Sequence, residues 1–205
     1  MERQTKKYFK YTAQFAHTYC RHEDFDQLYN FFVDTFLSIH GIPTGSLIDL
    51  CCGTGDIPGK FKSEFPNLSV TGYDESTEMI SFAKYSDVTF INKPINSIDG
   101  VFDNIISNNS YHHFDDPSAF WNVINRISHN RTKILISDVI RPDNESDVEQ
   151  IVEDVLGKNS IFKEAFTLSL TSSYTESELK EQIGKLNLVI VDTPIQNYKL
   201  FFVHN

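Results

Sequence analysis

The sequence predicts an α/β fold, a doubly wound Rossmann-like sheet of seven strands with helices on both faces. Five short apolar runs alternate with amphipathic segments between residues 46 and 139, which is typical of a parallel sheet with crossover helices. Only a few residues, "TPIQN", separate the last two apolar runs, at 188–192 and 198–203. This segment is too short for a helical crossover, so the sheet should be mostly parallel with an antiparallel last strand.

The strands and helices are expected where apolar residues recur with a period of two or with helical spacing. "YTESELKEQIGKL" contains a capping box from Thr175 to Glu178, and Asp116 with Pro117 opens another helix as N-cap and first residue. The first five strands are expected at 46–51, 68–73, 88–92, 102–107 and 132–139. The expected helix faces contain Ile57, Phe61 and Phe65; Phe120, Ile124 and Ile127; Val148, Ile151, Val152 and Val155; and Leu179, Ile183 and Leu186.

The segment before the first strand differs from the rest in its aromatic content. Phe25, Tyr29, Phe32 and Phe36 recur at helical spacing, which predicts a helix there. We expect residues 1–45 to form a helical lid or cap and residues 46–205 to form one ligand-binding domain. Such a lid would exclude water from a reaction beneath it.

The composition indicates a protein without a nucleic-acid partner or a membrane span. The formal charge is −10, so binding through phosphates is disfavoured. No apolar run approaches the roughly 20 residues that a membrane helix needs, and the charged start "MERQTKKYFK" is unlike a secretory signal. The three cysteines suggest reduced thiols rather than a disulfide framework. We therefore expect a cytoplasmic protein, and its oligomeric state is left open.

The stretch "IDLCCGTGD", residues 48–56, places a glycine-containing turn between a strand and a helix. Gly53 and Gly55 lack side chains that would block a ligand from the backbone N–H groups. Asp74 closes the second strand, where a carboxylate can accept hydrogen bonds from ribose hydroxyls. These features indicate a nucleoside-containing cofactor, and the spacing of glycines from Gly53 to Gly59 is also found in some nicotinamide-binding proteins.

Three features favour S-adenosylmethionine over a nicotinamide cofactor. Asp49 lies inside the first strand, where an acid suits a cationic amino-acid group better than a pyrophosphate. The antiparallel hairpin is expected at the end of the chain. The sequence contains neither a Tyr-x-x-x-Lys pair nor a second domain for hydride chemistry.

The residues Asp49 to Asp56 resemble motif I of class I S-adenosylmethionine-dependent methyltransferases. "TGYDESTEMISFAK" is similar to the following segment, and "FDNIISNNSYHHFDDP" to the fourth-strand motif of small-molecule, ubiquinone/menaquinone-type members. The resemblance implies that S-adenosyl-L-methionine is the cofactor, with the ribose at Asp74 and the adenine covered by Met79. The implied cofactor-binding residues are Asp49, Cys51, Gly53, Thr54, Gly55, Asp74, Glu75, Met79, Pro94, Ile95 and Asn108.

Two positions depart from the pattern of this family. Cys51 stands where the first glycine of D-x-G-x-G-x-G is usual, and a small side chain can fit there. Pro94 falls where an acid or amide usually binds the adenine N6, although the backbone N–H of Ile95 remains available to the ring.

Residues for the methyl acceptor are predicted after the fourth strand and in the lid. His112 and His113 follow the strand's carboxyl end and are candidate catalytic bases; the alternative is that they only shape the loop. Tyr11, Tyr19 and Tyr111 are candidate substrate contacts. A metal site at Cys51 and Cys52 is not expected, because adjacent residues on an extended segment point to opposite faces.

The expected function is methyl transfer to a small-molecule acceptor, through oxygen or nitrogen, by in-line displacement. Two alternatives remain open from the residues: an NAD(P)-binding oxidoreductase, or a non-catalytic binding protein with the same fold.

Overall fold

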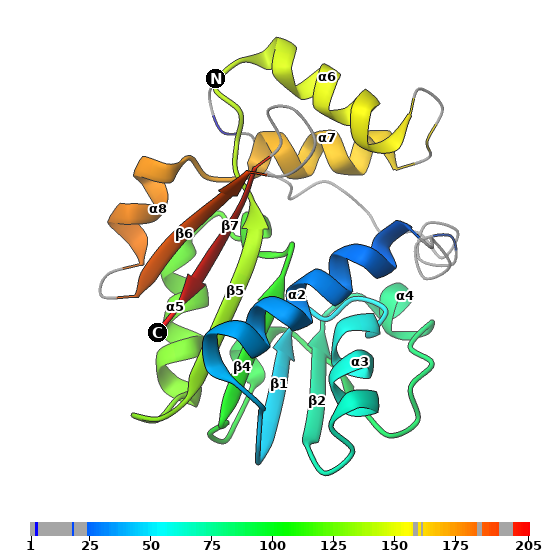
Figure 1. Cartoon of the computed structure of the whole chain (residues 1–205), viewed down its shortest axis with the longest axis vertical. Helices are drawn as coiled ribbons and strands as arrows, with labels where there is room; N and C mark the ends of the chain where they lie inside the picture. The colour runs from blue at the N-terminus through cyan, green and yellow to red at the C-terminus, as the bar shows by residue number, and fades with distance from the viewer. Residues whose placement is uncertain are drawn as a thin grey trace. The chain divides into compact units, whose positions relative to one another are not determined.

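The computed structural model describes residues 3, 18, 24–157, 160, 162–183, 186–192 and 199–205. Its strands form one seven-stranded sheet (Figure 1). They are β1 (Ser46–Leu50), β2 (Ser69–Asp74), β3 (Thr89–Asn92), β4 (Asn104–Asn108), β5 (Lys133–Val139), β6 (Asn187–Asp192) and β7 (Lys199–His204). The strand order is β3-β2-β1-β4-β5-β7-β6. All seven predicted strands are confirmed, with ends shifted by up to two residues.

The chain divides into two compact units, and β5 runs through both. We call Tyr11–Asn108 with Ala119–Leu135 the glycine-loop unit, and Met1–Lys10 with Asn109–Ser118 and Ile136–Asn205 the histidine unit. This division differs from the predicted boundary at residue 45, so a separate lid over residues 1–45 stays a prediction.

The glycine-loop unit is built on parallel strands. β1 pairs in parallel with β2 and β4, and β2 pairs in parallel with β3. Asp49 lies opposite Gly72, and Leu50 lies opposite Tyr73. The carboxyl ends of β1 and β2 therefore meet at the same edge of the sheet, which is where open α/β sheets bind ligands.

Two helices of this unit, α2 (Asp24–His40) and α3 (Asp56–Glu64), lie side by side (Figure 1). The buried rings of Phe36 and Phe61 meet edge to face with centroids 5.2 Å apart, a favourable aromatic geometry. Lys62 binds the carbonyls of Pro66 and Leu68, which closes the loop after α3. The remaining helical segments are α4 (Thr77–Ile80), the 3-10 turn η1 (Ile95–Ser97) and most of α5 (Pro117–Ile127).

Helix α5 begins as the sequence predicted. The Asp116 carboxylate accepts a hydrogen bond from the Ser118 N–H at 2.9 Å, and Pro117 is the first helical residue. Hydrogen bonding from the Ser118 side chain, together with this backbone hydrogen bond, lowers the pKa of Asp116. The predicted apolar face is buried, with Phe120, Ile124 and Ile127 at 0 to 1% exposure.

The histidine unit contains the 3-10 turn η2 (Tyr111–His113), α6 (Glu145–Leu156), α7 (Lys163–Ser172) and α8 (Glu176–Gln182). β6 and β7 pair antiparallel, as predicted. α6 and α7 lie side by side (Figure 1) and share a buried cluster of Val139, Val148, Ile151, Val152 and Leu170. The capping box of Thr175 and Glu178 at the start of α8 is present.

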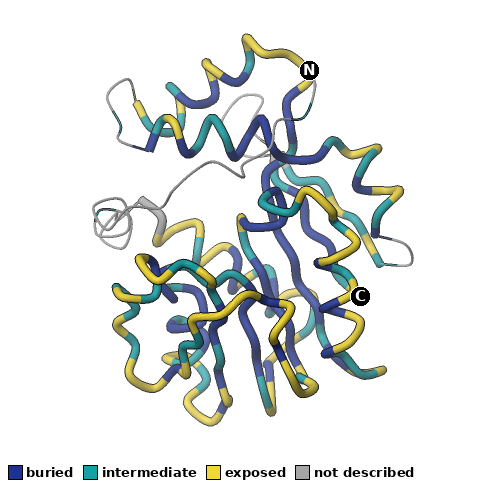
Figure 2. Tube along the Cα trace, turned by 180° about the vertical axis from the view of Figure 1, so that it is seen from behind, coloured by how far each residue is buried: buried dark blue, intermediate teal, exposed yellow. Residues whose placement is uncertain are grey.

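Buried residues follow the central strands (Figure 2). Leu47, Ile48 and Leu50 of β1 and Ile105 and Ile106 of β4 are fully buried. This matches a parallel sheet whose strands are covered on both faces. Within the described part of the chain, no helix is long and apolar enough to cross a membrane.

Candidate cofactor and acceptor sites

The turn between β1 and α3 depends on two glycines with positive φ. Gly53 has φ 58° and Gly55 has φ 78°, a region that favours glycine. A Cβ on Gly55 would also lie 2.3 Å from the ring of Phe90, so no other residue fits there without movement. Because neither glycine has a Cβ, Met79 and Phe90 can pack closely against the backbone of this turn.

Asp74 ties this turn to the end of β2. Its Oδ2 accepts a hydrogen bond from the Gly53 N–H and its Oδ1 one from the Ser76 N–H, both at 2.8 Å. Burial raises the pKa of Asp74, although these two hydrogen bonds act in the opposite direction. A carboxylate oxygen has a second lone pair, so both oxygens can still accept from ribose hydroxyls.

Asp49 is a buried acid close to the negative charge of Asp74. It is 3% exposed, and its pKa is raised well above the usual range, first by burial and then by the charge of Asp74. No described residue donates a hydrogen bond to its carboxylate or forms an ion pair with it. A cation bound beside Asp49 would compensate this buried charge, and the α-ammonium group of S-adenosylmethionine fits that requirement.

The two cysteines have different environments. Cys51 has φ 60° and belongs to the turn, so the argument that both cysteines lie on an extended segment was wrong. The Cys52 sulfur lies 2.7 Å from where a Cβ of Gly72 would be, and burial with the charges of Asp49 and Asp74 raises its thiol pKa. Cys52 is thus a packed, protonated thiol. Among the described residues, no group of three or more His, Cys, Asp and Glu is arranged to hold a metal ion.

The other predicted cofactor residues lie in the same unit. Met79 is buried, and its Cε is 3.2 Å from the position of a Cβ on Gly53, so it lies over the turn. Thr54 is buried and donates to Asp56 at 2.6 Å. Ile95 is buried in η1 and Asn108 is half-buried at the end of β4, whereas Glu75 and Pro94 are exposed. Their contacts to a cofactor stay predictions.

His112 forms a buried pair with an acid that the sequence reasoning missed. Its Nδ1 lies 2.8 Å from both carboxylate oxygens of Asp138, and both side chains are 1% exposed. The His112 backbone N–H donates to the same carboxylate at 2.9 Å, and the Val139 N–H donates at 2.7 Å. The signal was present in the sequence, because Asp138 lies near the end of an apolar strand.

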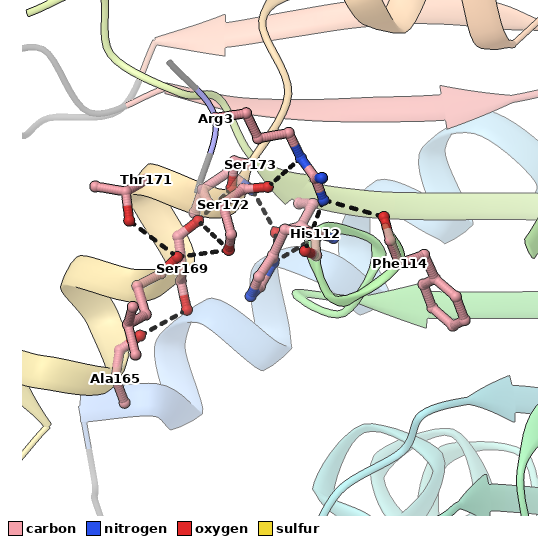
Figure 3. A network of polar contacts seen from close by, with 11 residues as sticks. Arg3, His112, Phe114, Ala165, Ser169, Thr171, Ser172 and Ser173 are labelled. Carbon is pink, nitrogen blue, oxygen red and sulfur yellow. Dashed lines mark hydrogen bonds and ion pairs between the residues drawn. The ribbon is translucent and has the colours of Figure 1, made fainter. Parts of the chain in front are cut away.

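Arg3 holds the loop of His112 from its carbonyl side (Figure 3). Its guanidinium donates to the carbonyls of Ser172, His112 and Phe114 at 2.7, 3.2 and 3.0 Å. It also lies 4.2 Å from the ring centroid of Tyr174 and 3.8 Å from Asp115. No sequence pattern marks this role for Arg3.

The candidate acceptor residues have different positions. Tyr111 is buried, donates its hydroxyl to Gln182 at 2.6 Å and packs its ring against the tilted ring of Tyr174, with centroids 5.1 Å apart, so its ring and hydroxyl both have partners within the chain. His113 is half-buried, with its ring 4.5 Å from that of His112. Tyr11 and Tyr19 lie outside the described residues. The roles of all these residues in acceptor binding or catalysis stay predictions.

The fold and the glycine turn define the class of protein. A mostly parallel sheet with an antiparallel last pair, a glycine turn after β1 and an acid at the end of β2 is the arrangement of class I methyltransferases. A family model described as "Methyltransferase domain" matches residues 43–188. The chain belongs to this methyltransferase family.

Solved structures agree with this assignment of the fold. The plantazolicin methyltransferase BpumL, crystallised with a triazolic desmethylPZN analog and SAH, superimposes with TM-score 0.66 at 16% identity, over 90% of this chain and 87% of that chain. A SAM-dependent methyltransferase from Aquifex aeolicus gives TM-score 0.67 at 15% identity, over 95% and 98%. The magnesium protoporphyrin IX methyltransferase from Synechocystis PCC 6803 with bound SAM gives TM-score 0.60 at 14% identity, over 98% and 88%.

Proposed function

We propose that the protein is an S-adenosylmethionine-dependent methyltransferase that transfers a methyl group to the oxygen or nitrogen of a small-molecule acceptor. One observation carries the proposal. The buried carboxylate of Asp49 and the half-buried carboxylate of Asp74 flank a glycine turn at the carboxyl ends of adjacent strands, and both have raised pKa values. A ligand with an ammonium group and a ribose would satisfy both, and a pyrophosphate would add negative charge beside them.

The residues of the glycine-loop unit would bind and orient the cofactor. Asp49 would attract the ammonium group, Asp74 would accept hydrogen bonds from the ribose, and Met79 would cover the ring system. The bound cofactor supplies a methyl group on a positively charged sulfur, which is already activated for displacement. Alignment of the reactants is then the main contribution of the protein and can lower a barrier by about 7 to 11 kcal/mol.

The ligands bound in the structural neighbours support a cofactor of this kind. The BpumL complexes contain SAH with desmethylPZN analogs, and the Synechocystis enzyme contains SAM. SAH and SAM are ligands of those proteins. We propose the same cofactor for this chain because its glycine turn and the carboxylates of Asp49 and Asp74 suit S-adenosylmethionine.

Calorimetric titration with S-adenosylhomocysteine tests the proposal. Asp74→Ala is expected to weaken binding by about tenfold or more, because it removes charge-assisted hydrogen bonds to the ribose and frees the Gly53 N–H. Asp103→Ala is the matched control, since Asp103 also accepts a backbone hydrogen bond, from Ser46 at 2.8 Å, but is exposed. Equal affinity of the Asp74 variant and wild type would refute the ribose assignment.

The same titration separates the two alternatives. Tight binding of NADH without binding of S-adenosylhomocysteine would indicate an oxidoreductase. Failure to bind either ligand would indicate a non-catalytic protein. If S-adenosylhomocysteine binds, incubation with methyl-labelled cofactor and fractionated metabolites then identifies the acceptor.

A further inference from the structure

The ring of Phe90, on β3, fills a space that two glycines leave open. Its nearest atoms lie 2.3 Å from where a Cβ on Gly55 would be and 3.0 Å from where a Cβ on Gly72 would be. The Cys52 sulfur lies 2.7 Å from the same Gly72 position. A glycine inside a strand weakens the strand and often marks a close approach of another group. Here that group is the Phe90 ring, which contacts both the glycine turn and β2.

Strand pairing places this ring on the face of the sheet that carries the two candidate cofactor carboxylates. Gly72 pairs with Asp49 of β1 on one side and with Phe90 of β3 on the other. Paired residues of neighbouring strands project from the same face, and side chains along one strand alternate between faces. Asp74, two residues after Gly72, therefore projects from this face as well. The glycine turn, both carboxylates and the Phe90 ring all belong to the glycine-loop unit.

The glycine turn is attached to β2 by two hydrogen bonds in its first half. The Gly53 N–H donates to the Asp74 carboxylate at 2.8 Å, and the Cys52 N–H donates to a backbone carbonyl of β2 at 2.9 Å. The Phe90 ring contacts the second half of the turn at Gly55, the residue before the first residue of α3. Packed side chains resist compression, so the ring limits how closely this half of the turn approaches β2 and β3.

We propose that Phe90 is a positioning residue of the cofactor site, whose ring sets the separation between the glycine turn and the end of β2. The inference rests on the proposed cofactor, and Phe90 acts on it through the backbone of the turn and through Asp74. A smaller side chain at residue 90 lets the turn shift toward the sheet and changes the geometry of the hydrogen bond from the Gly53 N–H to Asp74. Hydrogen bonds weaken steeply when their geometry departs from the optimum, so the same shift weakens binding of a ribose at this carboxylate.

The first test is hydrogen exchange of the Gly53 amide, measured by NMR in the free protein. Phe90→Leu keeps an apolar side chain but removes the ring that reaches Gly55. Exchange of the Gly53 amide should become faster by about tenfold or more relative to the β1 amides of the same variant, because the turn opens locally. Ile91→Ala is the matched control, since Ile91 is the next residue of β3 and projects from the opposite face; it should change both sets of amides by the same factor. Equal acceleration of both sets in Phe90→Leu would overturn the proposal.

The second test is a double-mutant cycle between Phe90 and Gly55, followed by urea unfolding. Gly55→Ala should lower the unfolding midpoint of the wild-type protein, because its Cβ meets the ring and because φ is positive. In a Phe90→Ala background the ring is absent and only the cost of the positive φ remains, so the same substitution should lower the midpoint by about half as much or less. Strictly additive losses would show that the ring does not limit the position of the turn, and would refute the proposal.

The third test connects the position of the turn to the ligand and separates the failures of the two proposals. In calorimetric titration under conditions where circular dichroism shows folded protein, Phe90→Leu should bind S-adenosylhomocysteine about fivefold more weakly or worse, and Ile91→Ala should bind as wild type does. If Phe90→Leu does not fold, Phe90→Met takes its place. Wild-type affinity of the Phe90 variant, or equal weakening by Ile91→Ala, refutes the role of Phe90 alone. Absence of binding by wild type refutes the proposed function, and the exchange and unfolding tests of the turn still apply.

Discussion

Replacing Cys51 by glycine should stabilise the protein. Cys51 has φ 60°, a conformation that costs a residue with a Cβ about 1–2 kcal/mol relative to glycine. Glycine loses about 0.4–1 kcal/mol more backbone entropy on folding. The half-buried thiol contributes little burial, so the net gain in the free energy of unfolding should be about 0.5–1 kcal/mol. For a chain of this size, that corresponds to an increase in Tm of about 1–4 °C.

Urea and thermal unfolding of three proteins measure this effect. Cys51→Ala is the matched control, because it removes the sulfur and keeps the Cβ that causes the strain. We expect Cys51→Gly to be more stable than both Cys51→Ala and wild type. A Cys51→Gly protein no more stable than Cys51→Ala would show that the turn is not strained at this residue.

Three further predictions follow from the described contacts. Gly55→Ala should lower the free energy of unfolding by about 2–4 kcal/mol and abolish S-adenosylhomocysteine binding, because it adds a clash with Phe90 to the cost of a positive φ. Gly100→Ala is the control, because Gly100 has φ 99° and open space where a Cβ would be; its free energy of unfolding should fall by only about 1–2 kcal/mol, and it should keep binding S-adenosylhomocysteine. Equal losses of stability in the two variants would exclude the clash with Phe90. Asp49 has a raised pKa in the folded protein, so its contribution to stability falls as pH rises from about 4 through that pKa. Asp49→Asn should therefore be more stable than wild type at pH 7 in chemical unfolding, while calorimetry shows weaker cofactor binding; a lower stability at pH 7 would contradict the burial argument. Arg3→Ala should lose about 1–3 kcal/mol in chemical unfolding, since three carbonyls lose a charged donor, and Arg3→Lys should recover only part because an ammonium lacks the planar fork. Full recovery by lysine would show that charge alone is needed.

Most of the fold could be predicted because it is encoded locally. Apolar runs of strand length predict buried strands, and the helical spacing of Ile57 and Phe61 predicts the buried face of a helix. The antiparallel hairpin followed from a connection too short for a crossover. The capping box at Thr175 and the proline at residue 117 marked helix starts to within a residue.

Helix α7 was missed because its pattern is not amphipathic in the usual way. Its sequence "KEAFTLSLTS" contains hydroxyl residues where an apolar face would be expected. In the structure the hydroxyls of Ser169, Thr171 and Ser172 donate hydrogen bonds to backbone carbonyls one turn earlier in the helix (Figure 3). Each buried hydroxyl is satisfied within its own helix, which residue spacing alone does not reveal.

More of the candidate cofactor site than of the candidate acceptor site could be predicted from the sequence. Asp49, Gly53 and Asp74 come from adjacent strand ends and one turn, so their proximity follows from strand order. The partners of His112 lie far from it in sequence: Asp138 is 26 positions away, and Arg3 is 109 positions away. Such contacts depend on tertiary packing and have no local signature.

The most direct test of the central claim is a crystal structure with S-adenosylhomocysteine. We expect the ribose hydroxyls within hydrogen-bond distance of the Asp74 carboxylate and the amino group beside Asp49. A ligand bound elsewhere, or these two carboxylates facing only protein groups in the complex, would contradict the account.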